Sequence, residues 1–263
     1  MSLSLVLQNN MIETHCHLDY LKDRPLEETL KLSEEAGVST FITIGVSPKN
    51  LDTVFEIATN NKQVYFTQGI HPHDAKLYTD EVETLIKSRT SEAKMVAVGE
   101  IGLDYHYDNS PRDTQCEVFE RQLKIAIEHN KPVVIHTRDA DEDTAEILKK
   151  LSPKLARKGV VHSFTSSPEL AQTVLDLGFY IGINGIITFK NAENVRDIVR
   201  LTPLDRMLIE TDSPFLAPIP NRGRENAPFN LPHIVKKIAE IKEVSEKEVI
   251  DITTRNAKAL FLL

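Results

Sequence analysis

Cysteine is scarce in this chain, because only Cys16 and Cys116 occur among its 263 residues. Two cysteines cannot build a disulfide framework, and this low usage suits a reducing compartment. No apolar run approaches the roughly 18 residues that a membrane span needs, and residues 1–10 lack a basic segment followed by a long apolar one. We therefore expect a cytoplasmic protein without a membrane segment or a secretion signal.

Positive charge is also in short supply, since the formal net charge is −8. This balance argues against a surface that holds nucleic acid nonspecifically over a wide area, so any nucleic acid would have to be bound locally, beside a pocket. Several catalytic motifs are missing as well: the chain has no Gly-x-Ser-x-Gly elbow, no Walker loop and no dinucleotide fingerprint. Serine hydrolases of the elbow type and these two classes of nucleotide-binding protein are thereby disfavoured.

What is present is a regular alternation of short β-rich runs and amphipathic helical stretches, which favours a parallel sheet with crossover helices. The expected strands recur roughly every 20 to 37 residues, as the βα units of a barrel of about 250 residues should. They span residues 11–16, 40–44, 65–69, 95–100, 132–136, 159–162, 180–183 and 206–210. These eight strands predict a TIM-type (β/α)8 barrel, and since no linker interrupts them, residues 1–263 are expected to form one domain.

The segments between and after these strands carry helix punctuation. Pro25 and Gly37 bracket one apolar stripe, and Pro168 and Gly178 bracket another, as a proline at the first helical position and a glycine after the last one should. Residues 214–232 are rich in Pro, Arg and Asn, which indicates a long functional loop rather than a domain linker. Two extra helices, over residues 232–241 and 245–261, are expected to close the chain.

The first expected strand ends in His15-Cys16-His17, and side chains two residues apart on a strand project to the same side. One metal ion could therefore accept both imidazoles, although isolated histidines often only form hydrogen bonds in a polar core. Their position favours a functional role, because barrel enzymes carry their catalytic groups at the C-terminal ends of the strands. Cys16 should point the opposite way and pack as a small apolar residue.

Other residues of metal-binding type occupy the same place on later strands: Glu100, His136, His162 and Asp212. Each follows an apolar strand that should be buried, and burying an unpartnered imidazole or carboxylate costs several kcal/mol. Ligation of a cation removes that cost, while a buried hydrogen-bonded set without metal is the alternative. Four histidines and two carboxylates exceed the needs of one tetrahedral ion, so we expect two divalent ions.

In this hypothesis His15, His17 and Asp212 hold the first ion, and His136 and His162 hold the second. Glu100 bridges the two ions, and a metal-bound water becomes the nucleophile. Asp212 is the expected group to orient that water and accept its proton, so Asp212 and Glu100 are the candidate catalytic residues. Histidine-rich ligation suits Zn or Mn better than Mg, which prefers oxygen ligands.

Four further residues are candidates for substrate binding. His71 and His73 follow the third expected strand and should face the same mouth, in a substrate-side or a merely supporting role. Arg138 could turn toward the site and bind phosphate, or pair with a nearby aspartate instead. Arg222 in the long loop could form part of a local basic rim, although loop arginines are often only solvated.

Six segments together make the chain similar to one known family. They are residues 14–19 (THCHLD), 69–73 (GIHPH), 98–105 (VGEIGLDY), 136–138 (HTR), 162–164 (HSF) and 210–214 (ETDSP). Over essentially its whole length the chain resembles the TatD-type deoxyribonucleases of the metal-dependent hydrolase superfamily. The resemblance implies a barrel, a divalent-metal site formed by the six residues above, and hydrolysis of DNA phosphodiester bonds, often exonucleolytic and commonly with Mg.

The chain departs from the family pattern at three places, none of them an expected ligand. The family usually has Asp where this chain has Glu13, and Gly where it has Ser166. In the long loop Ala227 stands where an acidic residue is usual, which weakens claims about substrate contacts there. Phe164, by contrast, lies within a matching segment and could stack on a base or pack in the core.

Two rival functions remain open. One is an amidohydrolase or another phosphoesterase that acts on a small molecule; many superfamily relatives bridge their ions with a modified lysine, whereas this chain offers Glu100. The other is a scaffold that retains the barrel without chemistry, which the complete ligand set disfavours. The expected partner is DNA as substrate, and nothing in the sequence indicates an obligate protein partner.

Overall fold

A computed structural model describes residues 10–263, so the expectation about a secretion signal falls almost wholly outside the described residues. Eight parallel strands lie side by side in sequence order. They are β1 (Met11–Cys16), β2 (Val38–Ile44), β3 (Val64–Gln68), β4 (Met95–Asp104), β5 (Val133–Arg138), β6 (Gly159–Val161), β7 (Tyr180–Ile183) and β8 (Met207–Ile209). All eight expected strands are present; β4 runs farther than predicted, to Asp104, and β6 ends sooner, before His162.

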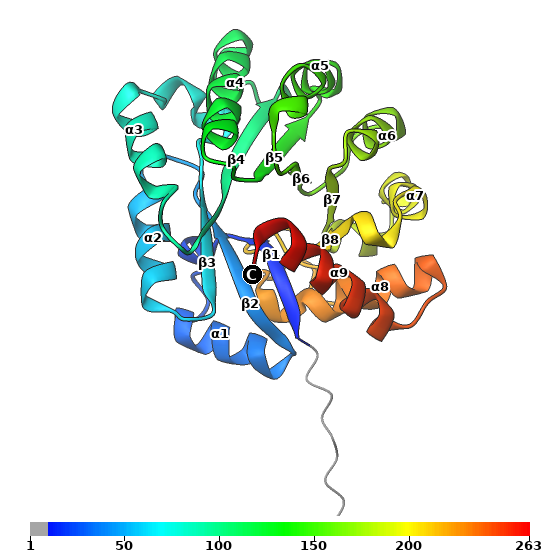
Figure 1. Ribbon diagram of the computed structural model, residues 1–263. Coiled ribbons are helices and arrows are strands. Elements are labelled where there is room, and N and C mark those ends of the chain that lie inside the picture. The colour runs from blue at the N-terminus through cyan, green and yellow to red at the C-terminus, as the bar shows by residue number, and fades with distance from the viewer. Residues whose placement is uncertain (1–9) are drawn as a thin grey trace, which may run out of the picture.

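The sheet curls into a ring in which β1 meets the last strand. The hydroxyl of Thr14 donates to the carbonyl of Ile209 at 3.0 Å. Just beyond β8, the backbone N–H of Asp212 donates to the carbonyl of His15 at 2.9 Å, and that of His17 donates to the carbonyl of Ser213 at 2.7 Å. Figure 1 shows the helices arranged outside the strands, which confirms the TIM-type (β/α)8 barrel.

The helices of the outer layer follow the strands in turn. They are α1 (Leu26–Glu35), α2 (Leu51–Asn60), α3 (Asp80–Arg89), α4 (Arg112–Glu128), α5 (Asp141–Leu151), α6 (Pro168–Asp176) and α7 (Glu193–Leu201), with α8 (Leu231–Lys242) and α9 (Glu246–Phe261) after β8. The two extra C-terminal helices are therefore confirmed. Across residues 10–263, no helix combines the length and the apolar character needed to cross a membrane.

Local sequence explains where these helices begin and end. The Ser167 hydroxyl accepts from the backbone N–H of Leu170 at 3.2 Å, and Pro168 follows at the first position of α6. Gly37 and Gly178, after α1 and α6, have φ of 89° and 86°, a left-handed conformation that glycine adopts without strain. Pro25 occupies the N-cap position of α1, so the helix begins at Leu26, one residue later than predicted.

The last helix decides which end of the barrel is open. Side chains from the starts of the strands, such as Ile12 in β1 and Val96 in β4, form one buried cluster with Ala257, Leu260 and Phe261 of α9. In Figure 1, α9 crosses in front of the strands and α8 lies beside it. Because α9 covers the N-terminal end of the barrel with apolar side chains, a polar site has room only at the opposite end.

Close packing of β4 against β5 depends on Gly102. Its φ is +138°, and a Cβ atom there would lie 1.9 Å from the carbonyl oxygen of His136. We expect Gly102→Ala to destabilise the fold by about 3 kcal/mol or more, because both strain and overlap with backbone would have to be relieved. Urea unfolding of the purified variant would measure the loss.

Gly223→Ala is the matched control for this prediction. Gly223 also has a positive φ, +81°, but a Cβ there would meet nothing within 4 Å. Strain alone should then cost about 1 to 2 kcal/mol. Equal losses in the two variants would contradict the claim that close strand packing requires Gly102.

Candidate metal centre

The six expected ligands lie together at the C-terminal end of the barrel. His15 is in β1, Glu100 in β4 and His136 in β5. His17 directly follows β1, His162 directly follows β6, and Asp212 lies shortly after β8. A cavity of about 870 Å³ opens there, and all of them except His15 line it. His15 is fully buried behind the wall. Sequence segments far apart in the chain therefore meet at one place, as the strand-end pattern predicted.

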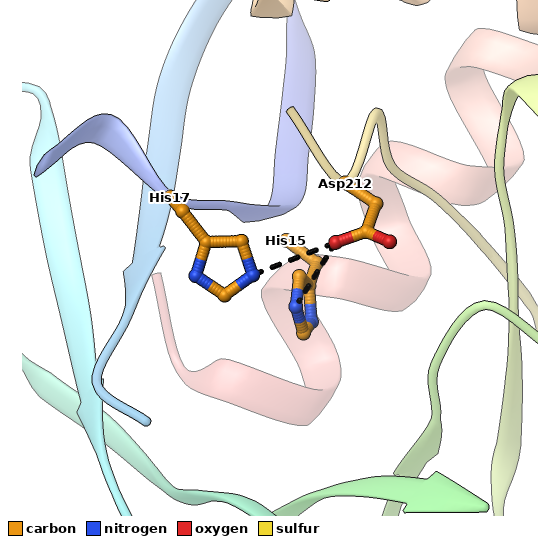
Figure 2. Close-up of side chains that lie close together, drawn as sticks. All are labelled: His15, His17 and Asp212. Atoms are coloured by element: carbon orange, nitrogen blue, oxygen red, sulfur yellow. Dashed lines mark ion pairs between the residues drawn. The ribbon is translucent and has the colours of Figure 1, made fainter. Parts of the chain in front are cut away.

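His15, His17 and Asp212 form the first cluster. Oδ1 of Asp212 lies 3.5 Å from Nε2 of His17 and 3.7 Å from Nε2 of His15 (Figure 2). One ligand atom from each residue lies within 4.8 Å of the others. Asp212 is held in place by its own backbone, with φ of 55° and the hydrogen bond to the carbonyl of His15. The three side chains thus face one point, as three ligands of a single ion would.

Glu100 lies between this cluster and a second one, which contains His71 and His136. Its Oε2 atom is 3.4 Å from Nε2 of His15. Its Oε1 atom is 2.8 Å from Nε2 of His162 and 3.2 Å from Nδ1 of His136. The two oxygens of one carboxylate therefore face histidines of different clusters, which is the arrangement that a bridging ligand requires.

His136 and His162, which are expected to hold the second ion, both face Oε1 of Glu100, and each also converges with other residues. The residues whose ligand atoms converge with His136 are Glu100 and His71, and Nε2 of His71 lies 3.4 Å from Oε1 of Glu100. His162 converges instead with His15 and Glu210, while staying close to Glu100. His71, for which the sequence indicated a substrate contact, has the position of a candidate ligand.

Two carboxylates that sequence reasoning gave no definite role support these histidines. Oδ2 of Asp104 accepts from Nε2 of His136 at 3.1 Å and from Nε2 of His73 at 2.9 Å. This leaves Nδ1 of His136 facing Glu100. Oε1 of Glu210 lies 3.5 Å from Nδ1 of His162, so that Nε2 of the same ring faces Glu100. Carboxylates behind metal-binding histidines orient the ring and raise its basicity.

A signal for both supporting carboxylates was present in the sequence. Asp104 and Glu210 are acidic residues at the ends of apolar strands, where the expected ligands also lie, and the structure buries both. Strand alternation alone does not tell which of several strand-end carboxylates contacts an ion and which contacts a histidine. That distinction depends on distances across the barrel.

The charges of Glu100 and of His162 stabilise one another. Burial alone would raise the pKa of Glu100, but the charge of His162 and neighbouring histidines holds that pKa well below its ordinary value. Burial would lower the pKa of His162, but the Glu100 carboxylate holds it well above the usual range. Burial lowers the pKa of His15 and of His71. Glu100 is thus an anion that needs positive charge around it.

Buried polar atoms without protein partners test whether a cation fits here. Both ring nitrogens of His15, Nδ1 of His17 and Oε2 of Glu210 are buried and make no hydrogen bond within residues 10–263. Leaving such groups unpaired costs about 1 to 3 kcal/mol each. Imidazole nitrogens and carboxylate oxygens are ligands of Zn, Mn and related divalent ions. The donor set therefore fits divalent metal.

Glu13, where the resembling family usually has Asp, ties the first strand to the last. Its carboxylate accepts from the backbone N–H of His15 and of Thr211, each at 3.0 Å. Burial raises the pKa of Glu13 to about 8, against the opposing effect of these hydrogen bonds. Cys16 points away from the cavity, as expected, and its Sγ donates to the carbonyl of Ile42 at 3.4 Å in the core.

The structure places three of the four expected substrate-binding residues at the cavity and the fourth away from it. His71, His73 and Arg138 line the cavity. The guanidinium of Arg138 lies 4.9 Å from the ring centre of Tyr107 instead of pairing with a neighbouring aspartate. Arg222 is exposed, stacks on Phe189 at 3.9 Å, and does not line this cavity in the described part of the chain. Phe164 is 2% exposed and packs in the core, so it presents no face to a base.

Comparison with known proteins gives concordant results. The family model described as TatD related DNase matches residues 12–262. "Uncharacterized metal-dependent hydrolase YabD" of Bacillus subtilis is 40% identical, over 95% of this chain and 98% of its own. "3'-5' ssDNA/RNA exonuclease TatD" of Erwinia tasmaniensis is 34% identical, over 93% and 95%. The crystal structure of YJJV, a TatD homologue from Escherichia coli, superposes with a TM-score of 0.91 at 30% identity, covering 98% of this chain and 100% of that one.

Proposed function

This chain belongs to the family of TatD related DNases and is a metal-dependent hydrolase, and we propose that it hydrolyses phosphodiester bonds of DNA from a strand end. One observation carries the proposal: the oxygens of Glu100 face histidines of two different clusters. Two ions that share one carboxylate can stabilise both the attacking and the leaving oxygen of an in-line displacement at phosphorus. The name of the Erwinia relative, a single-stranded DNA and RNA exonuclease, supports the same reaction class.

The ligands proposed for the first ion are His15, His17 and Asp212, and those for the second are His136 and His162, with Glu100 shared. His71 joins the second set as an additional candidate, because its Nε2 atom lies as close to Glu100 as Nε2 of His15 does. Bound divalent ions would supply an acidified water and charge stabilisation. The histidine-rich donor set favours Zn or Mn as resident ions, while Mg remains a candidate for supporting turnover.

The protein's own groups have separate tasks in this mechanism. Asp212 accepts the proton of the attacking water, because its carboxylate lies at the cavity wall beside His15 and His17. Burial would raise the pKa of Asp212, but its interaction with His17 keeps that pKa below the ordinary value, so the carboxylate is ionised and has a free place for a proton. Arg138 binds a phosphate oxygen, since it lines the cavity and no carboxylate neutralises it within the described residues.

A metal-resolved substrate screen tests the proposal. The purified protein is stripped of metal, reloaded separately with Zn, Mn or Mg, and assayed on single-stranded and duplex DNA, RNA, a lactone, a cyclic amide and a phosphomonoester. We expect nucleotides to be released from DNA in at least one metal form. Release from the lactone or amide alone would assign an amidohydrolase instead, and no turnover together with no bound ion would indicate a scaffold.

Metal binding is expected to weaken as the pH falls. In the metal-free protein, burial would lower the pKa of His17 and of His136, but hydrogen bonds to Asp212 and Asp104 respectively raise both values, and Glu100 raises that of His162. A raised pKa means that these imidazoles hold their protons to a higher pH than a free imidazole does, and an ion must displace those protons. Titration calorimetry in two buffers of different ionisation enthalpy should show proton release; an affinity independent of pH would contradict this.

A further inference from the structure

Two large aromatic side chains stand exposed at the mouth of the metal cavity. Tyr107 is 55% exposed and Phe215 is 51% exposed, and both line the cavity. Aromatic side chains bury a large area on contact and dominate the energetics of interfaces, so exposed rings at the rim of a cavity are candidate contacts for a ligand. These residues, and not the buried Phe164, present aromatic rings to a ligand at this site.

Phe215 stands beside the first cluster. Its ring lies edge to face with that of His17, with centres 6.0 Å apart and planes at 67°. The ring of Tyr20 stacks nearly parallel to that of His17, with ring centres 5.3 Å apart. It also meets the ring of Phe215 edge to face, with centres 6.5 Å apart. The backbone is anchored as well, because the N–H of Phe215 donates to the carbonyl of Asp212 and its own carbonyl accepts from Asn226. The ring is therefore held in place before any ligand arrives.

Tyr107 has an equivalent position beside the second cluster. Its ring is perpendicular to that of His73, with centres 5.3 Å apart and planes at 88°. The backbone N–H of Tyr107 donates to Oδ1 of Asp104 at 3.0 Å, and Asp104 also holds His136. The guanidinium of Arg138 lies 4.9 Å from the ring centre. A positive charge suited to phosphate thus accompanies the aromatic face.

The fold places the two rings on opposite sides of the site. Tyr107 follows β4 and Phe215 follows β8, and these strands are four positions apart in a ring of eight. In a closed barrel of eight strands, such positions face one another across the axis. The two clusters of candidate ligands lie between the rings at the same end of the barrel. A chain that passes over the ions would meet one ring on each side.

The charge of the protein makes aromatic contacts valuable for such a ligand. With a net charge of −8, the surface repels a polyanion, so binding cannot depend on counterion release over a wide area. Stacking of a base on an aromatic ring is independent of charge and tolerates any base sequence. It does require an unpaired base, because a base in a duplex already stacks on its neighbours.

We propose that Phe215 and Tyr107 form an aromatic clamp that takes one unpaired nucleobase on each side of the scissile phosphate. The inference rests on the proposed nuclease function and assigns to these two residues the selection of unpaired strands. The clamp contacts bases only, while Arg138 and the metal ligands contact the phosphate. Removing a ring should therefore weaken the binding and cleavage of a strand that carries bases more than those of the same backbone without bases.

The test compares an oligothymidylate with the same oligonucleotide carrying abasic sugars. For Phe215→Ala and for Tyr107→Ala, the preference of kcat/KM for the base-containing strand is expected to fall by about tenfold each. Phe215→Tyr should keep the preference, whereas Phe215→Leu, which keeps apolar bulk without a ring, should lose it. Leu201→Ala is the matched control: this exposed side chain lies at the end of α7, where the chain turns toward the start of β8, and its loss should not alter the preference.

Binding separates failure of the clamp from failure of the proposed function. Fluorescence anisotropy with phosphorothioate strands, which resist cleavage, measures the preference for bases in the metal-loaded protein without any turnover. Base-dependent binding that the ring variants lose, together with no cleavage of ordinary DNA, would support the clamp and refute the nuclease. Cleavage whose base preference survives in Phe215→Ala, Tyr107→Ala or Phe215→Leu would refute the clamp alone. Absence of both binding and cleavage would overturn both.

Discussion

Asp212→Asn is expected to lower kcat on DNA by about a thousandfold or more, while the protein remains folded. The asparagine has the shape of the aspartate but accepts no proton at neutral pH, so the attacking water loses its base. The backbone hydrogen bond from residue 212 to the carbonyl of His15 is independent of the side chain and should persist. Single-turnover cleavage, with circular dichroism to verify folding, measures the effect.

Asp74→Asn is a control that uses the same chemical change within the same cavity. Asp74 lines the cavity but belongs to none of the three groups with converging ligand atoms among the described residues. Its substitution should change kcat by no more than about threefold. A fully active Asp212→Asn protein would refute the role of Asp212 as base, and an equal loss in both variants would indicate a general electrostatic effect.

Glu100→Gln is expected to reduce the bound metal from two ions per chain to one or none, and to lower turnover by about a thousandfold or more. A neutral amide cannot share negative charge between two cations, although its size is the same. The substitution also removes the anion that sustains the raised pKa of His162. Elemental analysis of the purified variant, together with its kcat, measures both losses. Retention of two ions would contradict the bridging role.

His71→Gln in the same experiment distinguishes two roles for that residue. If His71 is a ligand of the second ion, as its 3.4 Å distance from Glu100 suggests, metal content should fall as it does in Glu100→Gln. If His71 contacts substrate instead, two ions should remain and KM should rise. The metal analysis therefore decides between the position that the structure gives His71 and the role that the sequence indicated.

Much of the fold could be predicted because barrel strands leave a strong pattern. An apolar run such as 132–136 has to be buried on both faces, and the polar residue that ends it has to find a partner. The ends of β4 and β6 were less predictable. Asp104 extends β4 although it is charged, since its carboxylate is satisfied by His136 and His73 from other parts of the chain.

The sequence by itself determined that this chain forms a barrel and that His15, His17, Glu100, His136, His162 and Asp212 meet at one end of it. Strand periodicity and the cost of burying polar groups favour both conclusions. Only the tertiary structure decided that His71 converges with Glu100 and His136, that Glu210 stands behind His162, and that Arg222 stacks on Phe189 away from the cavity. Periodicity states which side of a strand a residue occupies, whereas distances across the barrel and loop conformations arise from contacts between residues remote in sequence.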